Sequence, residues 1–188
     1  MFGLGFVSAG YRYQLGNVGP GGGIVYMLPG QYINYFGGIT NSTTEYFEIP
    51  DEDWYDGTDD PEAPWGCYGT LLGASGQNFG DGVLNTPIIL SNCATAGIAA
   101  RLCSNWSNDG YDDWFLPSTD ELVSAILNND DFSLGLTFGN PDPAYWSSTE
   151  ESTDSATIAT SSGGLGSGTA KYGNVGVRPV RSFEARYV

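Results

Sequence analysis

The stretch WFLPSTDELVSAILN, residues 114–128, specifies its local structure more tightly than any other part of the chain. Pro117 disfavours helical backbone at the residue before it, so the apolar run that precedes it is expected to be extended. Ser118 and Glu121 have the spacing of a capping box, in which each side chain accepts a hydrogen bond from the backbone N–H of the other. Apolar residues then recur at helical spacing. The sequence therefore predicts an extended segment followed at once by a helix over 118–128.

Glycine and proline divide the rest of the chain into short segments, since 28 Gly and 10 Pro occur among 188 residues. Five Trp, 12 Tyr and 9 Phe argue against a disordered chain. The order Asn85-Thr86-Pro87 predicts a short helix with Pro at its first position. A further helix is expected over 97–104. Strands are predicted at 24–28, 45–49, 145–148, 155–161 and 169–183, the last two forming a hairpin around the turn SSGGLGSG.

The charge balance excludes several classes of function. Six Lys and Arg stand against 22 Asp and Glu, which gives a net charge of −16, and there is no His. Without His, neither a Ser-His-Asp triad nor a His-bound metal is possible. General nucleic-acid binding is not expected, because it requires a basic patch. The residues that come nearest to such a patch are Lys171, Arg178, Arg181 and Arg186.

The three cysteines leave the redox state open. Cys67, Cys93 and Cys103 permit one disulfide with one thiol left over, or three reduced thiols. The N-terminal residues lack the basic region and continuous apolar core of a signal peptide. No run approaches the ~20 apolar residues of a membrane span. We therefore expect no membrane span.

Residues 1–14 (MFGLGFVSAGYRYQ) form an apolar N-terminal arm that precedes a single domain over 15–188. Two interpretations of the arm stay open. It is a disordered end or an extra edge strand, or it docks on a neighbouring subunit, because a free apolar terminus otherwise favours aggregation.

The candidate ligand site lies on the long loops. Residues 50–64 (PDEDWYDGTDDPEAP) are dense in carboxylates, which are the ligands that Ca²⁺ prefers, although the spacing misses the EF-hand pattern. A calcium site at Asp51, Asp53 and Asp56 is one hypothesis, and a solvated acidic loop is the other. Exposed aromatic rings can stack on sugars while carboxylates accept sugar hydroxyls. The candidate ligand-binding residues are Trp54, Tyr55, Asp56, Asp59, Asp60 and Tyr68.

A second set of residues is expected to be structural. Aromatic blocks beside apolar residues usually form a core. We expect Arg178 and Arg181 to pair with internal carboxylates rather than with an anionic ligand. The predicted structural residues are Trp114, Leu116, Ser118, Glu121, Trp146, Arg178 and Arg181.

Six sequence blocks in the same order resemble one known family. They are WGCYGT (65–70), NT…I (85–89), GIAARLC (97–103), DGYDDWFLPSTDEL (109–122), YWSSTE (145–150) and GVRPVRSF (176–183), after the opening GNVGPGGGIVY (16–26). The chain thus resembles, over residues 16–183, the C-terminal domain family of the Legionella collagen-like adhesin, related to the Fibrobacter major paralogous domain. The resemblance implies an α+β, C-type-lectin-like fold, with short helices packed on a twisted antiparallel sheet and long loops.

The same resemblance implies a function. Such domains sit on bacterial surface proteins and phage tail fibres, often as trimers, and bind surfaces or glycans. The adhesin binds an anionic polysaccharide through basic residues, whereas this chain is strongly acidic, so a neutral glycan or a protein partner is expected instead. The expected role is host or surface recognition by an oligomer, extracellular or on a virion, without a cofactor unless Ca²⁺ binds. The alternative is a structural virion or filament component assembled through the arm.

An enzyme is not expected. Asp59/Asp60 and Asp112/Asp113 are carboxylate pairs of the kind that glycosidases use, but neighbours on a strand point to opposite faces. The related fold of formylglycine-generating enzymes relies on cysteine chemistry. No positive charge near the three cysteines of this chain favours a reactive thiolate.

Overall fold

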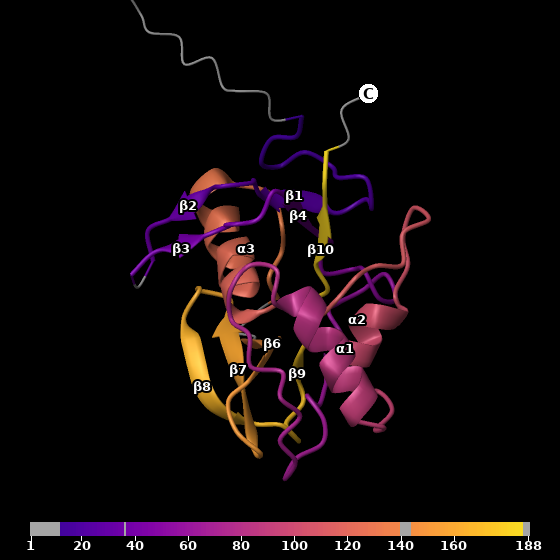
Figure 1. The fold of residues 1–188 in the computed structure, drawn as a ribbon. Coiled ribbons are helices and arrows are strands. Elements are labelled where there is room, and N and C mark those ends of the chain that lie inside the picture. Colours follow the sequence, from indigo (N-terminus) through magenta and orange to yellow (C-terminus); the bar gives the residue numbers. More distant parts are fainter. Residues whose placement is uncertain (1–11, 36, 140–143, 186–188) are drawn as a thin grey trace, which may run out of the picture.

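A central helix, α3 (Thr119–Phe132), lies between two β-sheets in the computed structural model of the chain (Figure 1). The structure describes residues 12–35, 37–139 and 144–185. Residues 1–11 of the predicted arm lie outside the described residues, and so does Arg186. Helix α3 packs on strand β1 of one sheet and on strands β6 and β7 of the other.

The smaller of these two sheets has the order β1-β4-β10 and is antiparallel throughout. Its strands are β1 (Ile24–Met27), β4 (Tyr46–Ile49) and β10 (Arg181–Phe183). It therefore pairs the first and last described strands with one another through β4. A separate short hairpin is made by β2 (Tyr32–Ile33) and β3 (Ile39–Thr40).

The larger sheet has the order β5-β9-β6-β7-β8, and within it only the β6–β9 pair is parallel. Its strands are β5 (Glu62–Ala63), β6 (Ala144–Glu150), β7 (Ser155–Thr160), β8 (Leu165–Ala170) and β9 (Val175–Gly176). Helices α1 (Gly82–Asn92) and α2 (Ala99–Asn105) pack on one another, and α1 also packs on β6. The chain is thus a mixed α+β protein, as predicted.

Two apolar clusters form the core. The first surrounds α3 and joins it to both sheets through side chains such as Phe47 and Tyr145. The second lies under α1 and α2 and centres on Trp65 and Trp146, whose indole N–H groups donate to backbone carbonyls of Ser147 and Ala63. Burial of large rings with their N–H groups satisfied stabilises the framework without leaving unpaired polar atoms.

The predicted capping box is confirmed. The Ser118 hydroxyl accepts a hydrogen bond from the Glu121 N–H, and the Glu121 carboxylate accepts one from the Ser118 N–H at 2.7 Å. The helix continues to Phe132, beyond the predicted end at residue 128. The predicted helix over 97–104 and the strands at 24–28, 45–49 and 145–148 are also present, with ends that differ by a few residues.

The predicted start of the first helix is wrong. Helix α1 begins at Gly82, so Pro87 lies inside it rather than at its first position. Asn85 lies in the first turns of the helix and donates its side-chain amide to the Gly76 carbonyl at 2.7 Å and to Ser148.

The predicted closing hairpin is also different. Strand β8 begins at Leu165, inside the segment expected to be a flexible turn, and pairs with β7. The segment 169–183 is not one strand, because β9 and β10 belong to different sheets on either side of Pro179. Pro lacks the N–H that a continuous ladder needs, which explains the break. Over the residues that the structure describes, no helix is long and apolar enough to cross a bilayer.

Candidate recognition surface

The loop after Trp65 is fixed at its start by a disulfide. Cys67 is bonded to Cys93 at the end of α1, with a Cα–Cα distance of 5.8 Å, which settles the cysteine pairing that the sequence left open. Cys103 is buried and free. Cys67 has a positive φ of 47°, which is uncommon for a residue with a side chain. At Gly66, where φ is 108°, a Cβ atom would come within 2.6 Å of Ile98, so only glycine fits there.

A buried ion pair fixes the end of the same loop. The Lys171 Nζ lies 2.6 Å from Glu150 Oε1, and neither side chain is accessible to solvent. Lys171 also donates to the Thr70 carbonyl at 2.9 Å, while the backbone N–H groups of Leu72 and Gly73 donate to the Glu150 carboxylate. Both members of the pair thus hold backbone atoms of the loop, which stays in one position as a result.

The pKa of Glu150 reflects these contacts. Burial by itself would raise the pKa of the Glu150 carboxyl, but the hydrogen bonds from Lys171, Leu72 and Gly73 outweigh burial, and the pKa is lowered. Lys171 also lies over the Trp65 ring at 4.8 Å, a cation–π distance. Glu150 is therefore ionised at neutral pH, and the ion pair is intact there.

Two tyrosines next to the disulfide and the buried ion pair are exposed to solvent. Tyr68 on the loop is 53% exposed and Tyr172, next to the buried lysine, is 69% exposed. Their ring centroids are 5.0 Å apart in an edge-to-face arrangement. Leu71, on the same loop, is 64% exposed, and residues 65–75 carry no charged side chain. We call Tyr68 and Tyr172 the tyrosine pair.

The acidic loop over 50–64 is anchored from inside by two of the predicted ligand residues, Trp54 and Asp60. Trp54 is only 7% exposed, and its indole N–H donates to Asp60 at 2.9 Å. Asp60 makes an ion pair with Arg178 and accepts from the Tyr145 hydroxyl at 2.7 Å. Burial raises the pKa of Asp60, although its contacts with Arg178 oppose that rise. Trp54 and Asp60 therefore hold the loop from inside, and their role in ligand binding stays a prediction.

The other predicted ligand residues of this loop face solvent. Tyr55, Asp56 and Asp59 are exposed, and hollows of about 410 and 390 Å³ lie on the two sides of the loop. The first hollow is lined by Asp59 and Asp60 among other acidic residues, and the second by Asp51, Asp53 and Trp54 together with Trp106. Five of the six predicted ligand residues thus lie within residues 54–60, and the sixth, Tyr68, lies on the loop described above; their binding role stays a prediction.

The structure does not gather the predicted calcium ligands. One carboxylate oxygen of Asp51 accepts hydrogen bonds from the Glu52 and Thr137 N–H groups, and Asp56 accepts from Thr58. Across 12–35, 37–139 and 144–185, no three side chains of the metal-binding types come together in a way that could hold an ion. Calcium binding at Asp51, Asp53 and Asp56 stays an untested prediction.

The predicted structural residues are all buried. Trp114, Leu116, Ser118, Glu121 and Trp146 lie in or beside the two clusters. Both arginines make ion pairs with carboxylates, Arg178 with Asp60 and Arg181 with Glu48 and Asp113. This internal pairing was the arrangement expected for them.

Sequence reasoning identified Tyr68 but missed the residues that support and complete the surface. Tyr172, Glu150 and Lys171 come from the end of the chain, far from Tyr68 in sequence. One signal was present, since Lys171 is the single lysine of a strongly acidic chain. A buried lysine in a chain with this many carboxylates is expected to pair with one of them.

Comparison with known proteins adds no relative. No protein-family model matches the chain. No curated protein matches it either.

Proposed function

We propose that the chain is a non-enzymatic recognition module of C-type-lectin-like fold, adhesin-like or receptor-binding, displayed on an extracellular or virion surface. The observation that carries this proposal is the tyrosine pair. The loop of the exposed Tyr68 is held by a disulfide at one end and by a buried ion pair at the other, and the exposed Tyr172 directly follows the lysine of that ion pair. Rigid exposed tyrosines are typical of binding surfaces, because little conformational entropy is lost when they contact a partner.

The chemistry of the surface favours an uncharged glycan. A sugar ring can stack on a tyrosine ring while the phenol hydroxyl forms hydrogen bonds with sugar hydroxyls. Residues 65–75 bear no charge, so nothing in that segment selects a charged ligand. The net charge of −16 opposes an anionic polysaccharide. A protein partner that covers Tyr68 and Tyr172 is the other possible ligand.

The backbone and the disulfide supply further support. Non-glycine residues with positive φ often occur at ligand sites, and Cys67, next to Tyr68, is one. Disulfides persist in oxidising compartments, so the Cys67–Cys93 bond fits an extracellular or virion location. Binding without turnover also fits the use of the loop carboxylates, because Asp60 and Asp113 are engaged by arginines.

A glycan array tests the recognition role. We expect the full chain to bind a neutral glycan, and Tyr68→Ala or Tyr172→Ala to weaken that binding at least tenfold. Tyr32→Ala is the matched control, since Tyr32 is an exposed tyrosine on β2, and it is expected to bind like the parent. Tyr55→Ala separates the tyrosine pair from the acidic loop. An array and a host-cell binding assay that both stay blank at high concentration would argue strongly against recognition.

A second candidate function is a structural one, in which copies of the chain assemble through the N-terminal arm. A specific contact favours it. Tyr13, near the end of the arm, packs edge-on against Tyr46 of β4 and Phe183 of β10, with ring centroids 5.6 and 5.1 Å apart. The arm therefore leaves the domain beside an edge strand. The two roles are compatible, because a homo-oligomer such as a trimer would present several tyrosine pairs together.

A further inference from the structure

The third strand of the smaller sheet has one edge that no strand of the described residues covers. Strand β10 pairs with β4 on one side. On its other side, Val180 and Phe115 exchange two backbone hydrogen bonds of 2.9 Å just before the strand begins. Beyond that bridge, no strand of the described ranges pairs with residues 181–183 on the side away from β4. An open strand edge is a template for pairing with another extended chain.

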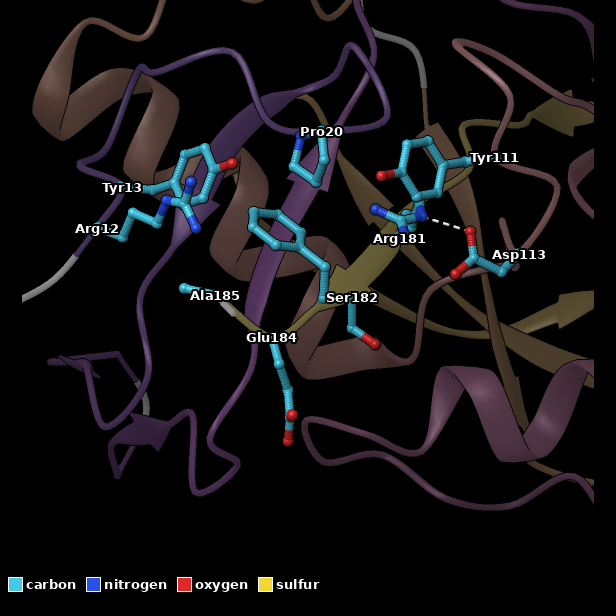
Figure 2. Close-up of a pocket in the computed structure, with 10 residues that line it drawn as sticks. Arg12, Tyr13, Pro20, Tyr111, Asp113, Arg181, Ser182, Glu184 and Ala185 are labelled. Atoms are coloured by element: carbon cyan, nitrogen blue, oxygen red, sulfur yellow. Dashed lines mark hydrogen bonds and ion pairs between the residues drawn. The ribbon is translucent and has the colours of Figure 1, made fainter. Parts of the chain in front are cut away.

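A hollow of about 520 Å³ lies at this edge, and Figure 2 shows the residues around it. Ser182 and Glu184 line it from β10 and the residue after that strand. Tyr111 and Asp113 line it from the segment that leads into Phe115. Arg181 lies 3.9 Å from the Tyr111 ring centroid and pairs with Asp113. The hollow thus offers an open backbone edge between aromatic side chains.

The N-terminal arm joins the domain beside this hollow. Arg12 and Tyr13 line the hollow, and the Arg12 N–H donates to the Tyr46 hydroxyl at 3.1 Å. The last residues of the arm, Arg12 and Tyr13, therefore lie beside this hollow.

The arm has the sequence of a strand that could use that edge. Phe2, Leu4 and Phe6 alternate with glycines, so an extended arm has one apolar face and one bare face. No residue from 1 to 11 is charged. A segment of this kind can add to an exposed sheet edge through main-chain hydrogen bonds, with its larger side chains in the adjoining hollow.

Charge also favours this surface as a meeting point for two copies. Each copy has a net charge of −16, so two copies repel one another over most of their surfaces. The hollow is less acidic than most of the surface, because Arg12 and Arg181 line it together with Asp113 and Glu184.

We propose that residues 1–11 of one copy pair with the open edge of β10 in a second copy, each copy giving and receiving one arm. Tyr13 packs against both β4 and β10, which places it over their shared face rather than at the edge. The edge itself, lined by Ser182 and Asp113, is open to the hollow and so accessible to the arm of a neighbour. The inference rests on the assembly role proposed above and names its partner, a second copy of this chain.

Light scattering on the size-exclusion eluate tests the exchange with the full chain. We expect a mass that is a multiple of 20.0 kDa, and expect Leu4→Asp/Phe6→Asp to reduce it to that of one chain. Val83→Asp/Leu84→Asp is the control, because it places the same charges on exposed apolar residues of α1 and should leave the mass unchanged. A parent chain that is already monomeric at all concentrations, or an arm variant with the parent's mass, overturns the proposal.

Cross-linking separates exchange between copies from pairing within one copy. The variant Ser8→Cys/Ser182→Cys, treated with a short bismaleimide, should give covalent oligomers. A cross-link found only within single chains overturns the exchange. The glycan array repeated on the monomeric arm variant keeps the two proposals distinct, since that variant retains Tyr68 and Tyr172. Binding by the monomer alongside loss of assembly supports both roles, whereas an unchanged mass contradicts the exchange and leaves recognition standing.

Discussion

Several charged side chains of this protein are buried in ion pairs, and these pairs determine how its loops are positioned. Lys171, Arg178 and Arg181, three of the six basic residues, are buried in ion pairs. Taking an ion pair out of water costs free energy, and the attraction between the charges offsets this only when the surrounding hydrogen bonds are also satisfied. Glu150 and Lys171 meet that condition by binding backbone groups of the loop that carries Tyr68. Their role is thus to position that loop.

Removing Lys171 should therefore be costly. Lys171→Met leaves the Glu150 carboxylate buried without its cation, and we expect the free energy of unfolding to fall by about 3–5 kcal/mol. Urea denaturation followed by tryptophan fluorescence measures this change. The double variant Lys171→Met/Glu150→Gln should recover part of the loss, because no uncompensated charge remains. Equal losses in the single and double variants would mean that the two side chains are not coupled.

Glu121 predicts a dependence of stability on pH. Burial raises its pKa to about 7, although it accepts backbone hydrogen bonds from Ser118, Gly80 and Gly82. The folded state therefore binds the proton more tightly than the unfolded chain does, and the contribution of this group to stability declines as pH rises from about 4.5 through about 7. Burial raises the pKa of Glu48 and Asp60 in the same direction. We expect a higher Tm at pH 5.5 than at pH 8.

Circular dichroism melts across that pH range, on the parent and on Glu121→Gln, check this expectation. Glutamine does not titrate, so the variant should lose much of the decline in Tm between pH 5.5 and 8. If both proteins show the same decline, Glu121 does not cause it, and the general repulsion among the many carboxylates would be the better explanation.

At the scale of elements, α1 contains a feature that works against its own stability. Pro87 lies inside the helix and is exposed. A proline there removes one helical hydrogen bond and crowds the carbonyl four residues earlier. We expect Pro87→Ala to raise the free energy of unfolding by about 1–3 kcal/mol, since Ala is favoured over Pro by roughly 3 kcal/mol in a helix interior. Chemical denaturation measures the change. A loss of stability would mean that the proline ring makes a necessary contact.

The elements differ in how far the sequence could predict them, and the reason is the range of the interactions that define each one. The start of α3 depends on Ser118 and Glu121, which contact one another within a single turn, so the local pattern was sufficient. The first turns of α1 include Asn85, which contacts Gly76 and Ser148, and no local pattern contains the contact with Ser148. The tyrosine pair is of the second kind, because Tyr172 is brought to Tyr68 only by the fold.

The same distinction explains Trp54 and Asp60. Both lie in an acidic loop of polar composition, and a loop of that kind is usually exposed. Arg178, from the far end of the chain, pairs with Asp60 and so draws that part of the loop inward. The sequence predicted that Arg178 would find an internal carboxylate, but it could not identify which of the many carboxylates this would be.

On the scale of the whole molecule, the two apolar clusters stabilise the fold, whereas the Cys67–Cys93 disulfide attaches the exposed loop to it. The clusters contain the large buried side chains and account for the stability of the fold. The disulfide joins the exposed loop to the end of α1 across a sequence separation of 26 residues. Its removal should therefore lower stability while leaving the fold intact.

Cys67→Ser/Cys93→Ser tests that division of tasks. We expect the free energy of unfolding to fall by about 2–4 kcal/mol, because the unfolded chain is no longer restricted by the cross-link. The loop is still held at its end by Lys171 and Glu150, so the loosening should be confined to residues near Tyr68. Hydrogen exchange should then accelerate at Gly69, whose N–H donates to the Thr153 carbonyl, and stay unchanged in α3. If α3 exchanges faster as well, the disulfide supports the whole framework rather than the loop. Unchanged glycan binding by this variant would show that recognition does not need the tyrosine pair to be fixed from the disulfide side.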